Sequence, residues 1–322
     1  MRSASGPISH ELGKFGAHRK GATWTINRAE AERDMRRLLW LLLPGLAGGV
    51  ATLHAPMVPA VCQSGAKRVH FVRHGEATHN VERTYRDPAN RDARLTSKGL
   101  AQCEALGDVT RGMSSIELIV VSPLTRTLQT AYTGFAAQAE RAVPFVALEA
   151  ARETVNYVCD ARSTAAQIRA EFPSVDLNGL AADDDAIWAR YVDTLGDQDA
   201  HTGRRESDDI DSVHARCVDL MRWILARPED EIAVVSHAAF LYHLFNFGHA
   251  PDATRHPDDA LASATSTNLA AGDREHPDAE HRAAIGAREP IVSYASGPLE
   301  RIVRAPWTNA ELRSVAVVPA RG

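Results

Sequence analysis

The segment Val69–Asn80 (VHFVRHGEATHN) places an arginine and a histidine directly after a short apolar run. Gly75 follows them and allows the backbone to turn sharply. A neutral imidazole is a good nucleophile near neutral pH, and a guanidinium binds phosphate through paired hydrogen bonds. We therefore take His74 as a candidate nucleophile toward a phosphoryl group and Arg73 as a candidate phosphate ligand. A charged surface turn is the alternative interpretation of this tetrapeptide alone.

The same arrangement recurs along the chain, because three further apolar runs are each followed by polar or charged residues. The run 116–121 is followed by Arg126. The run 142–148 is followed by Glu149 and then Arg152-Glu153, and the run 232–235 is followed by Ser236-His237. Each run has the length and the β-branched content that are typical of a buried strand. A last strand is expected over 314–318.

Helical spacing of apolar residues lies between these runs, over 96–109, 124–137 and 211–227, with Thr96 and Asp211 as expected N-caps. Alternating strands and helices predict a mostly parallel sheet that is covered by helices on both faces. In such sheets the functional crevice lies beyond the carboxyl ends of the strands. We therefore expect the four strands to bring these side chains to one edge: His74, Arg126, Glu153 and His237.

Three segments resemble the signature segments of the histidine phosphatase superfamily. They are RHGE at Arg73–Glu76, SPLTRTLQTA at Ser122–Ala131 and VVSHAAFL at Val234–Leu241. The resemblance covers roughly residues 67–247 and resumes at 309–318. It implies the phosphoglycerate-mutase-like fold, an α/β three-layer α/β/α sandwich with a mostly parallel central sheet. Further stretches, including CDARS at Cys159–Ser163, resemble a plant and fungal subgroup of this superfamily.

The resemblance also implies roles for individual residues. His74 would become the phosphohistidine, Glu153 would donate a proton to the leaving group, and His237 would act beside them. The phosphate pocket would comprise Arg73, Arg126, His74, His237 and Asn80. The resemblance implies no metal and no cofactor, because arginines neutralise the phosphate charge.

The proton donor is the role for which the sequence leaves two candidates. An isolated glutamate titrates near ~4.3, so the site must raise the pKa of a glutamic acid that donates a proton. Glu153 follows Arg152 in an Arg-Glu dipeptide that resembles the one that the family carries after this strand. Glu149 lies four residues earlier and is the alternative.

These residues predict a metal-independent phosphatase that hydrolyses a small phosphomonoester through a phosphohistidine intermediate. One alternative is a phosphoglycerate-mutase-like phosphotransferase, although residues 81–96 do not resemble the patterned loop of the glycolytic mutases. The other alternative is a non-catalytic phospholigand-binding module on the same fold. Its mark would be the loss of a core residue, and the four core histidines and arginines are all present.

Composition and chain ends set the outer bounds. The 322 residues are 44% hydrophobic and carry a formal net charge of −5, which gives no basic footprint for nucleic acid. Four cysteines show no metal-ligand spacing. We expect a single domain over 66–322 with an insertion of low order at about 248–306, whose histidines, including His281, should be solvated. The sequence indicates no oligomeric state.

We expect residues 1–60 to lie outside the folded domain. Residues 1–34 are polar and basic and are expected to be disordered. Residues 35–60 resemble the apolar part of a signal or anchor segment, and any contact with a membrane would be made through them. The default localisation is cytoplasmic, with secretory, organellar and membrane-anchored targeting as equal alternatives.

Overall fold

The computed structural model describes residues 24–26, 66–81, 83–201, 203–250, 279–295 and 297–318. Their strands form one eight-stranded sheet in the order β5-β4-β3-β6-β2-β8-β1-β7. The strands are β1 (Trp24–Ile26), β2 (Lys67–Arg73), β3 (Leu118–Val121), β4 (Phe145–Ala147), β5 (Val175–Asp176), β6 (Glu231–Ser236), β7 (Val292–Tyr294) and β8 (Leu312–Val318).

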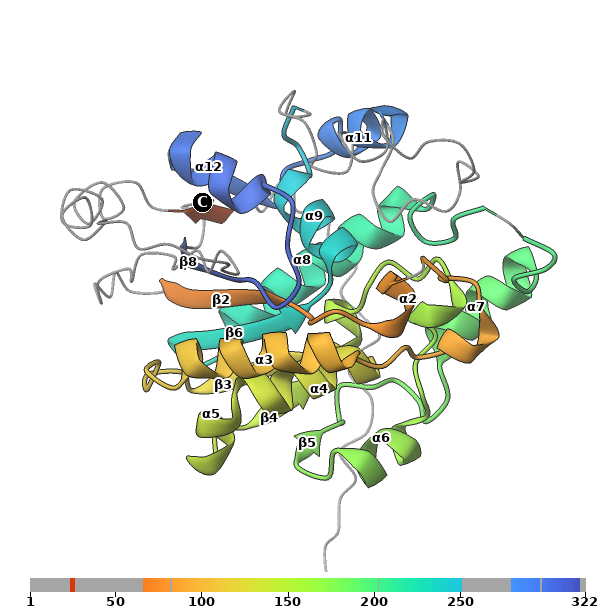
Figure 1. The fold of residues 1–322 in the computed structure, drawn as a ribbon. Coiled ribbons are helices and arrows are strands. Elements are labelled where there is room, and N and C mark those ends of the chain that lie inside the picture. The colour runs from red at the N-terminus through yellow and green to blue at the C-terminus, as the bar shows by residue number, and fades with distance from the viewer. Residues whose placement is uncertain are drawn as a thin grey trace, which may run out of the picture.

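Most of the strands run parallel to one another, as predicted. The five strands from β5 to β2 are mutually parallel, and β8 is antiparallel to both β2 and β1. The register between β2 and β6 pairs Arg73 with Ser236, so the residues that follow these two strands emerge side by side. The carboxyl ends of β2, β3, β4 and β6 therefore meet at one edge of the sheet (Figure 1).

Helices pack against both faces of the sheet, which confirms the predicted three layers. One face carries α3 (Ser97–Thr110), α4 (Thr125–Gly134), α5 (Ala136–Glu140) and α6 (Ala165–Glu171), and the other carries α8 (Ile210–Ala226), α9 (Ala238–Asn246), α11 (Ala279–Gly286) and α12 (Gly297–Arg304). The remaining helical segments are α2 (Thr78–Val81), α7 (Ala186–Leu195), η1 (Pro88–Asn90), η2 (Glu149–Ala151) and η3 (Val158–Asp160).

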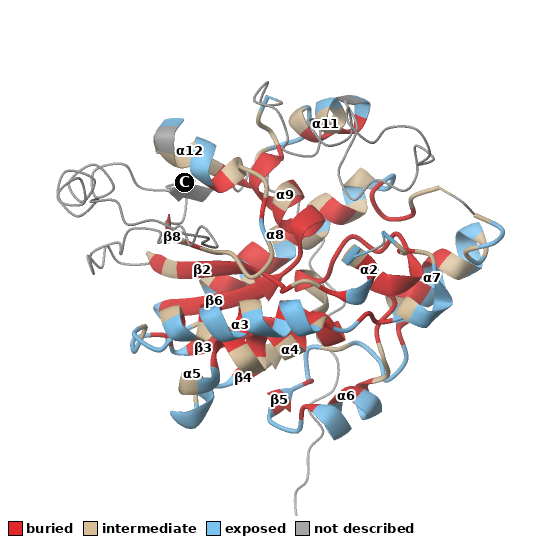
Figure 2. Ribbon diagram, viewed as in Figure 1, coloured by how far each residue is buried: buried red, intermediate tan, exposed pale blue. Residues whose placement is uncertain are grey.

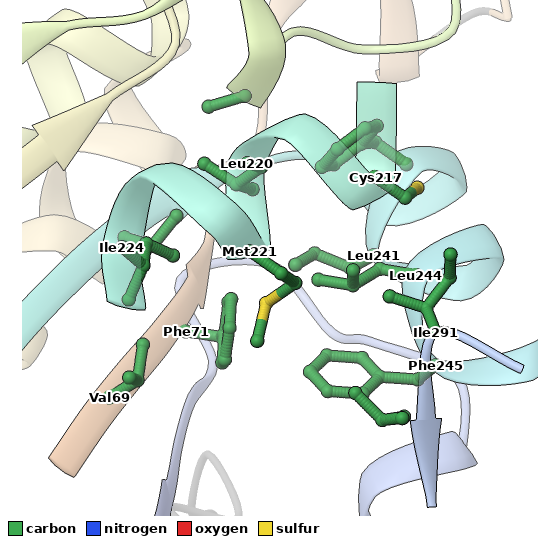
Figure 3. Packing of buried hydrophobic residues seen from close by; sticks show 14 of the residues in the cluster. Val69, Phe71, Cys217, Leu220, Met221, Ile224, Leu241, Leu244, Phe245 and Ile291 are labelled. Atoms are coloured by element: carbon green, nitrogen blue, oxygen red, sulfur yellow. The ribbon is translucent and has the colours of Figure 1, made fainter. Parts of the chain in front are cut away.

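The two apolar cores follow from the alternation of side chains along the strands. Val69 and Phe71 of β2 pack toward α8 and α9, whereas Val72 packs toward α3 and α4. Figure 3 shows Met221 of α8 directed between Phe71 and Phe245. The rings of these two phenylalanines lie edge to face, with 5.1 Å between their centroids. The central strands β3 and β6 are buried along their whole length, β8 alternates between buried and partly exposed residues, and the outer surface of α3 is exposed (Figure 2).

The first residues of α3 and α8 are set by N-cap side chains. Thr96 caps α3 as predicted, because its hydroxyl accepts a hydrogen bond from the Gly99 N–H at 3.0 Å. The prediction for α8 is wrong by two residues, since the cap is Asp209 rather than Asp211.

The run 142–148 is also shorter as a strand than predicted. Ala142 has a φ of 59°, which is incompatible with a strand, so β4 begins at Phe145.

The C-terminal part differs from the expected insertion of low order. Residues 279–304 form α11, β7 and α12, and they place Ile285, Val292 and Val303 in the core on the α8 side. Apolar residues in this part are few, and these three are buried although Ile302 is 56% exposed, a difference that composition does not show. Residues 251–278 lie outside the described residues.

The N-terminal expectations fall almost entirely outside the described residues, as does the apolar segment 35–60. Residues 24–26, within the extension that was expected to be disordered, form β1 and pair with β7 and β8. Across the described ranges, no helix is both long and apolar enough to cross a bilayer.

Candidate active site

His74 lies at the carboxyl end of β2 and is completely enclosed. Its Nδ1 lies 2.6 Å from the carbonyl oxygen of Gly75, and a carbonyl can only accept, so Nδ1 carries the hydrogen. Burial, followed by the nearby charges of Arg126 and Arg73, holds the pKa of His74 well below its usual value. The imidazole is therefore neutral, with the lone pair on Nε2.

The turn after His74 is packed too closely for any side chain at residue 75. A Cβ at Gly75 would lie 2.7 Å from the carbonyl oxygen of Gly99 in α3 and 2.9 Å from Sγ of Cys103. The Gly75 N–H donates to the hydroxyl of Thr130 in α4 at 3.1 Å. Contacts with two helices thus fix the direction in which the nucleophile points.

His237 follows β6 and lies beside His74, with 5.1 Å between the ring centroids. Its Nε2 is 2.7 Å from the hydroxyl oxygen of Ser122, which follows β3. Its Nδ1 is buried and has no hydrogen-bond partner within the described residues. Burial and the charge of Arg126 lower the pKa of His237 well below its usual value, so this second imidazole is neutral as well.

Arg126, in the first turn of α4, is held by a loop that the sequence did not connect to it. One Nη donates to the carbonyl oxygen of Cys159 at 2.7 Å, and the other donates to the carboxylate of Asp160 at 3.0 Å. Burial raises the pKa of Asp160, against the opposing effect of Arg126. The Nε of Arg126 is buried without a partner in the described part of the chain. The guanidinium is thus fixed in place, with a donor still available.

Arg73 and the backbone of His74 are connected to the C-terminal segment. Arg73 is 8% exposed and donates to the carbonyl oxygen of Trp307 at 2.6 Å. The carbonyl oxygen of His74 accepts from the Ala310 N–H at 3.1 Å and from Nδ2 of Asn309 at 3.3 Å. The segment that leads into β8 therefore completes the back of the site.

The two candidate glutamates lie in different surroundings. Glu153 lines the pocket, where its carboxylate accepts hydrogen bonds from the N–H groups of Phe240 and Ala239 at 2.8 and 3.3 Å, in the first turn of α9. Glu149 instead accepts from Arg162 at 2.8 Å and from Arg152 at 3.1 Å. The geometry favours Glu153 as the carboxyl that can reach a substrate, because Glu153 lines the pocket with backbone N–H groups as its hydrogen-bond donors, whereas Glu149 is outside the lining and pairs with two buried arginines.

The side-chain amide of Asn80 is hydrogen-bonded to two residues of its own segment. Its Oδ1 accepts from the Ala77 N–H at 3.1 Å, and its Nδ2 lies 3.0 Å from Nε2 of His79. His79, which the sequence did not single out, is 3% exposed and lies 6.0 Å from His74 between ring centroids. The residue next to the predicted one therefore enters the site.

A hollow of about 460 Å³, including space open to solvent, has Arg126 and Glu153 in its lining, whereas His74, Arg73 and His237 do not line it. The lining also includes His79, Asp160 and His281. His281 was expected to be solvated, but it is 7% exposed and lies 3.0 Å from Nε2 of His243. The difference arises because α11 packs on α9, a tertiary contact that the surrounding polar sequence does not reveal.

Sequence reasoning therefore found the strand-end residues and missed three others: His79, Asp160 and His281. The available signals were weak, since His79 adjoins Asn80 and Asp160 lies in the CDARS stretch, whereas nothing near His281 pointed to the site. Within the described residues, no group of three or more histidines, cysteines or acidic residues is placed to hold a metal ion.

Residues 69–280 match the histidine phosphatase superfamily (branch 1). The chain is 30% identical over 214 residues to a protein of Arabidopsis thaliana named phosphoglycerate mutase-like protein, and the match covers 56% of this chain and 74% of that one. It is 29% identical over 121 residues to a probable phosphatase of Schizosaccharomyces pombe, covering 36% and 55%. A solved Bacillus stearothermophilus protein, YhfR, is 19% identical with a TM-score of 0.34, covering 66% and 85%.

Proposed function

The chain belongs to branch 1 of the histidine phosphatase superfamily, and from this premise we propose that it hydrolyses a small phosphomonoester through a phosphohistidine formed on His74. The observation that carries the proposal is the pair of neutral imidazoles whose ring centres lie 5.1 Å apart. In this pair, His74 has its Nδ1 hydrogen committed to Gly75 and its Nε2 lone pair available. This geometry selects Nε2 as the atom that becomes phosphorylated.

In the first step, Nε2 of His74 attacks phosphorus, and the bond between phosphorus and the ester oxygen breaks as the new P–N bond forms. The equatorial oxygens then carry most of the charge. Arg73, Nε of Arg126 and Nδ1 of His237 are the groups that would donate hydrogen bonds to them. Because these donors are already fixed in the protein, they stabilise the transition state without further reorganisation.

Glu153 would supply the proton that the departing alkoxide needs. Its contacts with the first turn of α9 favour the carboxylate, so it must take up a proton when the phosphate dianion enters the pocket. In the second step, water attacks phosphorus and gives a proton to Glu153. The P–N bond breaks, inorganic phosphate leaves and His74 is neutral again.

The test is hydrolysis of a panel of phosphomonoesters by the full chain in the presence of a chelator, with His74→Ala as the control. We expect release of inorganic phosphate by the wild type and a loss on the order of 10³–10⁶-fold in the variant, as when other enzymes lose their nucleophile. Quenched wild-type enzyme should contain phosphohistidine at Nε2, detectable by ³¹P NMR.

Two results would overturn the proposal. The first is activity that the chelator abolishes and His74→Ala leaves unchanged. The second is exchange of phosphate between two glycerate phosphates with negligible release of inorganic phosphate, which would identify a mutase instead.

A further inference from the structure

His79 is a buried imidazole inside the candidate active site that the proposed mechanism does not use. It lies on α2, the short helix that follows the RHGE turn, and lines the same hollow as Arg126 and Glu153. Its ring centre is 6.0 Å from that of His74 and 5.6 Å from that of Tyr85. Its Nδ1 is buried and has no hydrogen-bond partner among the described residues.

The hydrogen bonds of Asn80 determine where the His79 hydrogen resides. The Ala77 backbone N–H can only donate, so the Asn80 atom that it contacts, at 3.1 Å, must be the amide oxygen. The other end of the amide is therefore the NH₂ group, which donates to Nε2 of His79 at 3.0 Å. An accepting Nε2 has no hydrogen, so a neutral His79 must carry its hydrogen on Nδ1.

His79 is neutral in these surroundings. Burial, followed by the positive charges of Arg126 and Arg73, holds its pKa well below the usual value. A neutral donor suits this position, since it adds a hydrogen bond to an anion without adding a third positive charge beside the two arginines. The charges of Arg126 and Arg73 favour an anionic oxygen as the partner of this donor.

We propose that the Nδ1–H of His79 donates directly to a phosphoryl oxygen of the substrate, and that Asn80 acts by fixing the orientation and tautomer of His79. This inference rests on the proposed function for the identity of its ligand. It assigns Asn80 a positioning role in place of the direct phosphate contact that the family resemblance implied.

Two substitutions of His79 separate the donor from the bulk of the ring. The amide nitrogen of Asn in His79→Asn can occupy nearly the position of Nδ1, whereas that of Gln in His79→Gln reaches the position of Nε2. We expect His79→Asn to retain most of the wild-type kcat/KM. His79→Gln should lose about 10²–10³-fold, which is typical when one fixed donor to a transition-state oxyanion is removed. Circular dichroism and thermal melting of both variants check that they fold.

Asn80→Asp tests the positioning role. The Asp carboxylate can still accept from Ala77, but its second oxygen would accept from Nε2–H and so move the His79 hydrogen away from Nδ1. We expect a loss similar to that of His79→Gln, and little further loss when the two changes are combined, because both remove the same donor. Losses that multiply in the double variant would show that Asn80 contacts the phosphate independently, and would overturn the positioning role.

The decisive measurement does not need turnover. ¹⁵N NMR of the imidazole side chains in the full chain reports which nitrogen of His79 is protonated, and titration with inorganic phosphate reports whether Nδ1 responds. We expect a protonated Nδ1 and a selective shift of its resonance. A hydrogen on Nε2, or a His79 signal that is unchanged when phosphate saturates the site, would overturn the proposal. If the wild type hydrolyses no phosphomonoester, the proposed function fails while this measurement still decides the role of His79.

Discussion

Two buried regions of this protein concentrate charged and titratable groups, and they differ in how these groups are paired. At the strand-end rim, Arg126 and His237 keep a buried nitrogen without a hydrogen-bond partner among the described residues. In the neighbouring wall, which we define as Glu149, Arg152, Arg162 and Asp185, Arg152 donates to both oxygens of Asp185 at 2.7 and 2.8 Å and to Glu149 at 3.1 Å, while its Nε has no hydrogen-bond partner among the described residues. Arg162 in the same wall donates to Glu149 and to four backbone carbonyl groups.

The difference shows which buried charges support the fold and which are available to a ligand. The pKa of Asp185 is lowered through its contacts with Arg152, despite the opposing effect of burial, so this ion pair stays charged. A buried charge is tolerated only when it is compensated, and in the wall the chain itself provides the partner. At the rim, Nε of Arg126 and Nδ1 of His237 have no hydrogen-bond partner among the described residues, and the proposed phosphate site would use them as donors.

Among the changes that compare the two regions, the largest expected effect is on catalysis and comes from Glu153, at the junction of rim and wall. Glu153→Ala should slow hydrolysis of esters with poor leaving groups by about 10²–10⁴-fold, and slow activated aryl phosphates much less, because only the former need a donated proton. Steady-state kinetics on a series of leaving groups measures the difference. Glu149→Ala is the matched control, since its carboxylate belongs to the wall. Equal slowing of both ester classes by Glu153→Ala would move the acid role elsewhere.

The wall should respond through stability rather than catalysis. Asp185→Ala leaves the buried Arg152 without its main counter-charge and removes the N-cap of α7, whose Trp188 N–H donates to Asp185 at 3.0 Å. We expect a loss of about 3–5 kcal/mol in the free energy of unfolding, measured by urea denaturation. Asp219→Ala, which breaks a pair with the exposed Arg222, should cost at most about 1 kcal/mol. Similar losses in both variants would refute the distinction.

The smaller effect per residue is the pH dependence of stability that each buried histidine creates. The pKa values of His74, His79 and His237 are lowered, and that of His243 falls to about 3. Below about pH 6.5 the unfolded chain binds protons that the folded protein does not, so stability declines as the pH falls. The decline should be about 1.4 kcal/mol per histidine between pH 7.5 and 5.5.

Urea denaturation across this pH range measures the decline in the free energy of unfolding. His79→Asn removes one of the four histidines and should make this decline smaller by about 1.4 kcal/mol. A free energy of unfolding that stays level, or that rises as the pH falls, would mean that these imidazoles are protonated in the folded protein.

Prediction from sequence was strongest where local patterns and strand order act together. His74, Arg126 and His237 each follow an apolar run, and parallel pairing brings the ends of such runs to one edge. The last strand, β8, was also expected, although it begins at Leu312 rather than 314, and only the structure shows that it runs antiparallel to β2. Prediction failed for α11 and for His281, because the burial of a few apolar residues among polar ones depends on which surface receives them.

Asp160 shows the same limit within the site. Its carboxylate pairs with Arg126, 34 residues away along the chain, and accepts hydrogen bonds from the N–H groups of Asn156 and Tyr157 at 3.2 and 3.0 Å. The local sequence can indicate the turn around Asp160, but it does not indicate that Arg126 is the partner of its carboxylate. The separation of Glu149 from Glu153 was likewise decided by which arginines reach each carboxylate.

The amino-acid sequence by itself determined the alternation of strands and helices, the family signatures and the choice of residues that we propose as nucleophile and phosphate ligands, because these follow from residue type and short-range spacing. Only the tertiary structure decided which nitrogen of each histidine is available, which glutamate faces the pocket and which arginines are already paired. Those outcomes depend on hydrogen bonds and burial between residues far apart in the chain, and such contacts exist only after the layers have packed together.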